Sequence, residues 1–259
     1  MLDTRTQIED LRLEVFAATA DMAAAAAAGT AEVLTRAVAE RGAARVVIAT
    51  GNSQLAFVTA LAGYDVPWSK VTVFHMDEYV GIDADHPASF RRWIRERIAA
   101  PFGPAQVEYI DGEASDVEAE CARYEALLRE APIDLTCMGI GENGHLAFNE
   151  PGQADFDDAR WVRQISLTPE SLHQQVGEGH FPNVDAVPPT AISLTVPALL
   201  SARHVQVVAP EKRKAAAVRN TLTLPIDASC PSTILRRTAH ATLYLDADSA
   251  GDSLDLLPA

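Results

Sequence analysis

The chain has 259 residues, an apolar share of 48% and a formal net charge of −15 at pH 7. This length suits one large domain or two small ones, and the apolar share is enough for a sizeable core. The negative charge argues against nucleic acid or an anionic membrane as the main partner, and an anionic substrate would need a locally positive site. Because no Pro/Gly/Ser-rich linker or abrupt change in charge divides the sequence, we expect a single domain over residues 1–259.

The cysteines and the alanine run indicate where such a chain would reside. Cys121, Cys137 and Cys230 are odd in number and widely spaced, which is neither a disulfide framework nor a zinc pattern. The alanine run 23–28 is flanked by acids and is too short and too weakly apolar to cross a membrane, so we expect a helix there. With no secretory signal visible, the sequence predicts a cytoplasmic protein.

Strands and helices are expected to alternate along the first half of the chain. A strand is expected over 11–16, at a sheet edge or with one face in water, and a helix over 19–40. Further along, we expect a strand over 45–49, a helix after Gly51-Asn52-Ser53, a strand over 71–76, an arginine-rich helix over 88–99, a short strand over 107–110, and a helix beginning at 115–118 with capping-box spacing.

The second half continues this alternation around one irregular segment. A buried strand is expected over 133–138, strands over 191–196, 204–209 and 241–245, and a helix over 211–222. Segment 167–189 has few periodic apolar positions, and a stretch of this length is usually functional or mobile. The repeated strand–helix units predict an α/β fold: a doubly wound, mostly parallel open sheet with helices on both faces, Rossmann-like, carrying one mobile lid segment at about 167–189.

The most informative motif follows the strand over 133–138. Residues 139–151 read Gly-Ile-Gly-Glu-Asn-Gly-His-Leu-Ala-Phe-Asn-Glu-Pro, with His145 and Glu150 on one glycine-rich loop. An open α/β sheet places its chemistry on such loops at strand ends, and histidine moves protons near neutral pH. A lone histidine is more often structural, but its position among three glycines at a strand end favours a catalytic role. An enzyme is therefore the leading hypothesis.

A second polar loop follows the strand over 45–49. It contains Thr50, Gly51, Asn52 and Ser53, whose hydroxyls and free amides at a helix start suit a phosphate group. The same residues could simply cap the helix, so both interpretations stay open.

A third polar group ends the strand over 71–76. Neighbouring side chains at a strand end point different ways, so one of Asp77 and Glu78 can face a cleft while the other holds the loop. A solvated turn is the ordinary alternative for such a pair. His75 lies inside the strand and is expected to be structural.

Three cations, Lys212, Arg213 and Lys214, stand at the start of the last expected helix. They oppose the helix dipole, which favours acids in the first turn, and a bound anion would relieve that conflict. For Lys212 and Arg213 a solvated basic face is an equal alternative.

Taken together, these loops resemble the glucosamine-6-phosphate deaminase family, part of a superfamily that also contains 6-phosphogluconolactonases. The resemblance runs from about Val46 to Leu245. Residues 74–81, Phe-His-Met-Asp-Glu-Tyr-Val-Gly, are similar to the family's Asp-Glu-Tyr signature, and residues 139–151 are similar to its catalytic loop. A lactonase would be expected to carry a Gly-His-Thr version of this loop without the Phe-Asn-Glu-Pro ending.

The resemblance implies conversion of glucosamine 6-phosphate to fructose 6-phosphate with loss of ammonia, without a metal or an organic cofactor. It implies that His145 opens the sugar ring, that Asp77 moves the proton from C2 to C1, and that Glu150 orients His145. It further implies that the phosphate is held by the loop residues Thr50, Gly51, Asn52 and Ser53 and by the cation Lys214.

This chain departs from the family pattern in two places. Asn143 stands where an aspartate is usual, and its amide oxygen is expected to accept a hydrogen bond from the imidazole without stabilising an imidazolium as a carboxylate does. The expected lid has no counterpart of a phosphate-binding arginine, and His173, Gln174 and Gln175 are the nearest candidates.

Segment 152–158 is acidic and lacks the basic and hydroxyl residues that bind an allosteric amino-sugar phosphate in regulated members, so no such activation is expected. Because the family contains monomers and hexamers, the resemblance leaves a homo-oligomer open.

Three alternative functions are kept. Two are other enzymes of this fold, a 6-phosphogluconolactonase and a galactosamine-6-phosphate deaminase or isomerase, since a single hydroxyl contact can decide the C4 epimer. The third is a sugar-phosphate sensor without catalysis, which the retained Asp77, His145 and Glu150 and the lack of room for a DNA-binding module disfavour.

Overall fold

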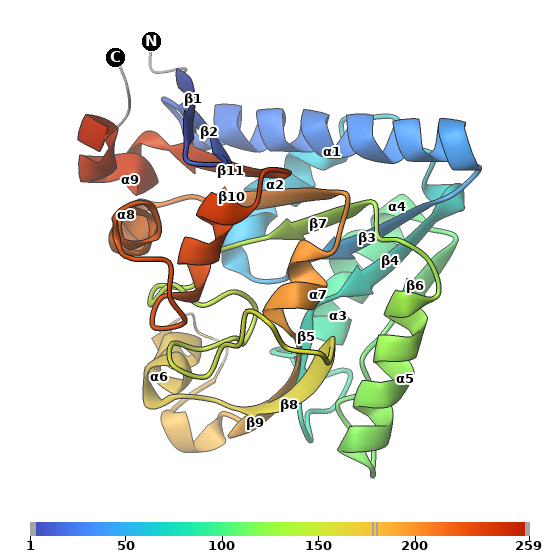
Figure 1. Ribbon diagram of the computed structural model, residues 1–259. Helices are drawn as coiled ribbons and strands as arrows, with labels where there is room; N and C mark the ends of the chain where they lie inside the picture. The colour runs from blue at the N-terminus through green and yellow to red at the C-terminus, as the bar shows by residue number, and fades with distance from the viewer. Residues whose placement is uncertain (1–3, 178, 180, 257–259) are drawn as a thin grey trace.

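A computed structural model of the chain describes residues 4–177, 179 and 181–256. In it an eight-stranded sheet forms the centre of the molecule, in the order β1-β2-β11-β10-β7-β3-β4-β6 (Figure 1). All neighbouring strands run parallel except β1 and β2. In sheet order, the strands are β1 Thr4–Ile8, β2 Leu11–Phe16, β11 Ala241–Asp246, β10 His204–Ala209, β7 Leu135–Met138, β3 Ala44–Ile48, β4 Val71–His75 and β6 Gln106–Glu108.

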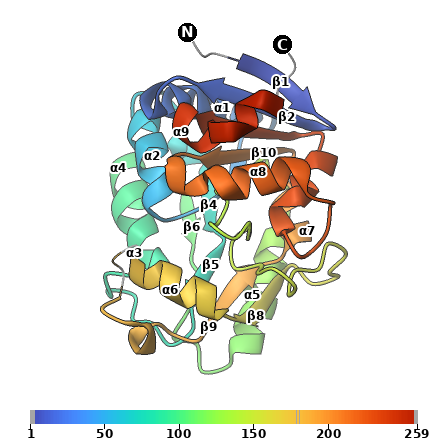
Figure 2. The ribbon, with the colours of Figure 1, turned by 90° about the vertical axis from the view of Figure 1, so that its left-hand side faces the viewer.

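Helices cover both faces of this sheet (Figures 1 and 2). One face packs against α1 Thr19–Arg41, α2 Leu55–Leu61 and α3 Phe90–Ile94, through a cluster that includes Leu34, Phe57 and Ile94. The other packs against α5 Val117–Arg129, α7 Val196–Leu200, α8 Ala215–Thr223 and α9 Ala247–Ala250. The prediction of a doubly wound α/β fold is confirmed.

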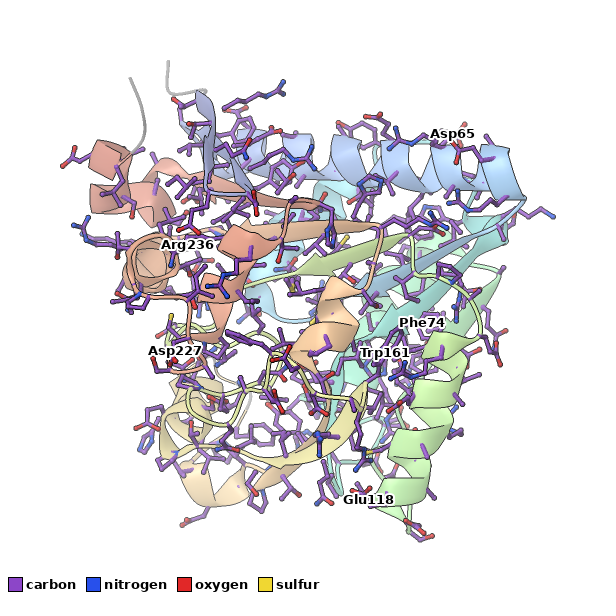
Figure 3. The ribbon with its side chains drawn as sticks, viewed as in Figure 1. Asp65, Phe74, Glu118, Trp161, Asp227 and Arg236 are labelled. Carbon is purple, nitrogen blue, oxygen red and sulfur yellow. The ribbon has the colours of Figure 1, made fainter. Side chains whose placement is uncertain are left out.

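The second core includes aromatic contacts that fix β4 against α5. Phe74, labelled in Figure 3, lies edge-on to Tyr124 of α5 with ring centroids 5.9 Å apart. The Tyr124 hydroxyl donates to the carbonyl of His75 at 2.8 Å and accepts from the His75 amide at 3.0 Å. The end of β4, where Asp77 follows, is therefore held rigidly.

The strand order changes direction between β3 and β7. From β3 the chain moves outward through β4 to β6, then returns to place β7 on the other side of β3, followed by β10 and β11. In open α/β sheets ligands bind at such a switch point, beyond the carboxyl ends of the strands. The loops after β3, β4, β7 and β10 all reach this point.

A second, three-stranded sheet lies below the carboxyl ends of the main sheet in Figure 1. Its strands are antiparallel: β5 Asp77–Tyr79, β9 Thr190–Leu194 and β8 Val162–Ser166. With α6 Pro169–Gly177 it encloses a third, smaller core, which contains Tyr79, Phe148 and Phe181.

The element predictions were wrong in several details. Of the two alternatives for the strand over 11–16, the edge position was wrong, because β1 pairs with its outer side. The alternative of one face in water is confirmed, since one face is buried and the other is partly exposed. The strand expected over 191–196 belongs to the second sheet and ends at Leu194, because Thr195 caps α7. Asp116, rather than Ser115, caps α5.

The arginine-rich helix begins and ends later than predicted and is less regular. It begins as α3 at Phe90, passes through a π-helical turn over Arg95–Ala99, and ends as α4, Ala100–Phe102. Segment 167–189 is not irregular throughout, since it contains α6 and a short helical turn over Val184–Ala186. Among the described residues, no helix is both long and apolar enough to cross a membrane.

Candidate active site

A pocket opens at the switch point of the main sheet. The loops after β3, β4, β7 and β10 all contribute to its wall, and α6 closes one side. Seven of the nine predicted site residues line it: Thr50, Gly51, Asn52, Ser53, Asp77, His145 and Lys214. The other two, Asn143 and Glu150, lie behind His145.

Asp77 and Glu78 point in different directions, as neighbouring side chains at a strand end do. Asp77 lines the pocket, whereas the fully buried Glu78 points into the protein and accepts hydrogen bonds from the backbone amides of Phe90 and Arg91 and from the Ser89 hydroxyl. Glu78 thus holds the loop and the start of α3. Burial, and secondarily the charge of Glu78, raises the pKa of Asp77 to about 8.

His75 is buried behind Asp77 and does not reach the pocket. Its Nε2 accepts the Ile110 amide at 2.9 Å, so its Nδ1 carries the proton and donates to the Asp77 carbonyl, also at 2.9 Å. Burial lowers the pKa of His75 to about 3, and the ring is neutral. His75 therefore fixes the backbone at Asp77.

The loop after β7 folds back so that His145 stacks on Gly141. The Gly141 amide donates to the His145 carbonyl at 2.9 Å, and a Cβ at position 141 would overlap the imidazole ring. Position 141 therefore requires glycine, because the imidazole of His145 lies too close to the backbone for any side chain. Ala147, in the same loop, has a φ of 51°, a strained conformation of the kind that clusters at functional sites.

Behind His145 lies Glu150, whose side chain has no exposed surface. Its Oε2 is 3.7 Å from His145 Nδ1 and accepts a hydrogen bond from Asn143 Nδ2 at 3.0 Å. The Asn143 oxygen accepts the backbone amide of His145 at 3.1 Å. The hydrogen bond that the structure shows for this oxygen is thus to the backbone of His145, whereas the sequence predicted one from the imidazole.

The loop after β3 and the turn after β10 face each other across the pocket. No side chain of the segment from Gly51 to Gln54 caps the following helix, which weakens the interpretation of these residues as a cap. Lys214 is buried at the pocket wall, in a helical turn that precedes α8, and Lys212 is exposed. Glu211, just before this turn, has a φ of 77°.

Segment 167–189 contributes more to the site than the sequence indicated. Of the three polar candidates there, Gln174 and Gln175 line the pocket, while His173 is exposed and its Nδ1 lies 2.6 Å from the Pro169 carbonyl. The hydroxyls of Thr168 and Ser171, which sequence reasoning missed, donate to Glu150. No periodic signal in the sequence marks these two residues.

The described residues include no group of three or more His, Cys, Asp or Glu side chains that could hold a metal ion. The groups that could act on a ligand are the buried carboxyl of Asp77, His145 with a carboxylate behind it, and Lys214 with the polar loop after β3.

The family model described as glucosamine-6-phosphate isomerases/6-phosphogluconolactonase matches residues 17–244. The chain belongs to this family. A glucosamine-6-phosphate deaminase of Listeria innocua is 34% identical over 203 residues, which cover 78% of this chain and 85% of that protein. One of Lactobacillus delbrueckii subsp. bulgaricus is 31% identical over 224 residues, covering 86% and 92%.

Solved structures of this family superpose over most of the chain. A monomeric glucosamine-6-phosphate deaminase gives a TM-score of 0.84 at 26% identity, covering 92% of this chain and 98% of that one. A 6-phosphogluconolactonase from Shewanella baltica gives 0.72 at 20% identity, covering 90% and 96%, and shows the shared fold alone.

Proposed function

We propose that this protein converts glucosamine 6-phosphate and water into fructose 6-phosphate and ammonia. The observation that carries the proposal is the convergence on one pocket of Asp77, His145 and Lys214. These groups supply a base, a second proton-transfer group and an anion-binding cation, which an aldose–ketose isomerisation of a phosphosugar requires. The deaminase relatives support the same reaction.

The phosphate is held at the end of the pocket formed by Lys214 and the loop from Thr50 to Ser53. A lysine ammonium and loop amides provide positive charge locally, despite the net charge of −15. Anchoring the phosphate places C1 and C2 of the sugar near Asp77 and His145 at the other end.

His145 opens the pyranose ring. The C1–O5 bond breaks as the ring oxygen gains a proton and the C1 hydroxyl loses one, which gives the open-chain aldehyde. With His145 Nδ1 directed at Glu150, Nε2 is the nitrogen left for this transfer.

Asp77 then carries the proton between the two carbons. It takes the proton from C2 while the aldehyde oxygen at C1 gains one from the substrate ammonium, which gives an enolamine with a hydroxyl at C1. It then returns its proton to C1, which gives the protonated imine of fructose 6-phosphate. Water hydrolyses that imine to the ketone and ammonia. A carboxyl with a pKa of about 8 is a stronger base than an ordinary one, and a cationic nitrogen on the substrate favours its charged form.

The test is ammonia and fructose 6-phosphate production by the purified protein, beside Asp77→Asn and His145→Gln, with the exposed His173→Gln as a matched control. We expect both products from the wild type and the control, and losses of at least about 100-fold in the other two variants. Activity on 6-phosphogluconolactone without ammonia release, or on galactosamine 6-phosphate alone, would replace the proposal with the corresponding alternative.

Two further properties, the location of the protein and the role of α6, are proposed with the reaction. We propose a cytoplasmic location, because all three cysteines are free and buried, as a reducing compartment allows. We also propose that the segment around α6 acts as the lid over the pocket, since Gln174 and Gln175 form part of its wall.

A further inference from the structure

Glu150 is held from two sides, and one of them is α6. From the catalytic loop, Asn143 Nδ2 donates to Oε2 and His145 Nδ1 faces the same oxygen. From the other side, the Ser171 hydroxyl makes a short hydrogen bond to Oε1, and the Thr168 hydroxyl donates to Oε2 at 3.4 Å. The groups of Asn143, Ser171 and Thr168 donate hydrogen bonds that fix the orientation of the carboxylate, and His145 Nδ1 lies 3.7 Å from it.

The contacts from α6 are buried and supported by the fold. Ser171 is 1% exposed and Glu150 is 0% exposed, so water does not compete for the bond between them. Thr168 Oγ1 also accepts the backbone amide of Ser171 at 3.3 Å, so the start of α6 is organised around the carboxylate. Gln175 Oε1 accepts the Tyr79 hydroxyl at 2.6 Å, which ties the helix to the strand that begins at Asp77.

This arrangement decides which nitrogen of His145 carries the proton. With Oε1 taken by Ser171, Oε2 is the oxygen that faces Nδ1, and a carboxylate there favours the Nδ1–H tautomer. Nε2 is then free of a proton and directed to substrate. Without the Ser171 hydroxyl, the carboxylate can turn about its terminal torsion, which is broad for glutamate, and lose this alignment.

We infer that Ser171 is a positioning residue for ring opening, acting through Glu150 on the tautomer of His145. Because Ser171 belongs to α6, the histidine is correctly protonated when that helix is packed against the catalytic loop. Thr168 plays the same part more weakly, since its bond is longer. The inference rests on the proposed function for its kinetic consequence, but its structural consequence can be measured in the free protein.

The kinetic test compares Ser171→Ala with Ser166→Ala, a matched change at an exposed serine of β8, in wild-type and Glu150→Gln backgrounds. A hydrogen bond to a charged group corresponds to about 10- to 100-fold, so we expect kcat of Ser171→Ala to fall by that factor with KM changed less than about twofold. In the Glu150→Gln background, Ser171→Ala should have little further effect. An equal loss in both backgrounds would mean a merely structural role and overturn the inference.

The second measurement does not depend on any substrate. In protein labelled with ¹⁵N-histidine, the His145 signals are assigned by their absence in His145→Gln. We expect an Nδ1–H tautomer in the wild type and in Ser166→Ala, and a mixture of tautomers in Ser171→Ala. An unchanged tautomer in Ser171→Ala refutes the inference even if ammonia is released, whereas a changed tautomer in a protein that releases none upholds it and refutes only the proposed function.

Discussion

Replacing Gly141 by alanine tests the architecture of the catalytic loop with the addition of one methyl group. The backbone of Gly141 does not have a positive φ, so alanine can adopt its conformation. The consequence is therefore steric: a Cβ would overlap Nε2, Cε1 and Cδ2 of His145. All three ring atoms lie more than about 1 Å inside normal contact distance.

The size of the effect follows from this overlap. The loop is tied down on both sides of Gly141, by the hydrogen bond to His145 and by that from the Gly144 amide to the Gly141 carbonyl, so the imidazole is the part that moves. A displacement of about 1 Å at a reacting group costs about 100-fold in rate, or about 2.7 kcal/mol in the activation free energy. Overpacking should lower the free energy of unfolding by about 1–3 kcal/mol.

Ammonia release and thermal unfolding measure the two effects separately. Gly177→Ala is the matched control, because a Cβ at Gly177 would meet no atom within 4 Å. We expect Gly141→Ala to lose about 100-fold in kcat while remaining folded at the assay temperature, and Gly177→Ala to keep its kcat. Full activity in Gly141→Ala would show that the ring position seen beside Gly141 is not the one used in catalysis.

Four further outcomes are expected. The value of kcat/KM should rise with pH up to about 8, as Asp77 loses its proton in the free enzyme, and pH-rate profiles will show whether it does. Since folding raises the pKa of Asp77, its charged carboxylate destabilises the folded protein increasingly between about pH 4 and 8. Asp77→Asn should therefore be inactive. At about pH 9 it should unfold at a higher temperature than the wild type, and at about pH 4 this difference should be absent. Lys214→Ala should raise KM by about 10- to 100-fold, while Lys212→Ala should leave KM unchanged. A smaller rise of KM in Lys214→Ala would mean that the phosphate binds elsewhere. Rate curves should stay hyperbolic with N-acetylglucosamine 6-phosphate present, and a sigmoidal curve that this compound steepens would contradict the absence of an activator site.

The strand ends could be predicted because each parallel strand is a short apolar run followed by a turn with glycine or acids. Runs such as 45–49, 71–76 and 133–138 are buried on both faces, so hydrophobicity alone marks them, and parallel strands bring their carboxyl ends to one edge. The sequence therefore predicts that Asp77 and His145 lie at the same edge of the sheet, and both line the pocket there. The second sheet was not predictable in this way, because β5 has only three residues and β8 does not alternate apolar and polar residues cleanly.

The contacts of the loop after β7 escaped prediction for a different reason. Asn143 could bond the imidazole or the backbone, and which it does depends on the loop's exact path, which is set by the close approach of Gly141 to His145. The contact of Ser171 with Glu150 joins residues from two elements whose docking depends on a core of aromatic side chains around Tyr79 and Phe181. Local sequence contains no information on such docking.

The same dependence explains why the sequence did not predict α6. A helix that packs mainly through its own apolar face shows a 3.6-residue period, whereas α6 has only Leu172 and Val176 packed against the third core. Its remaining attachments are polar: Ser171 to Glu150, and Gln175 to Tyr79. Hydrogen bonds of this kind contribute about 0.5–3 kcal/mol each, so a helix attached by a few of them can leave the pocket at small cost in free energy. The polar residues that interrupt the apolar pattern are therefore consistent with the lid role proposed for this segment, and they are the residues that complete the arrangement around His145.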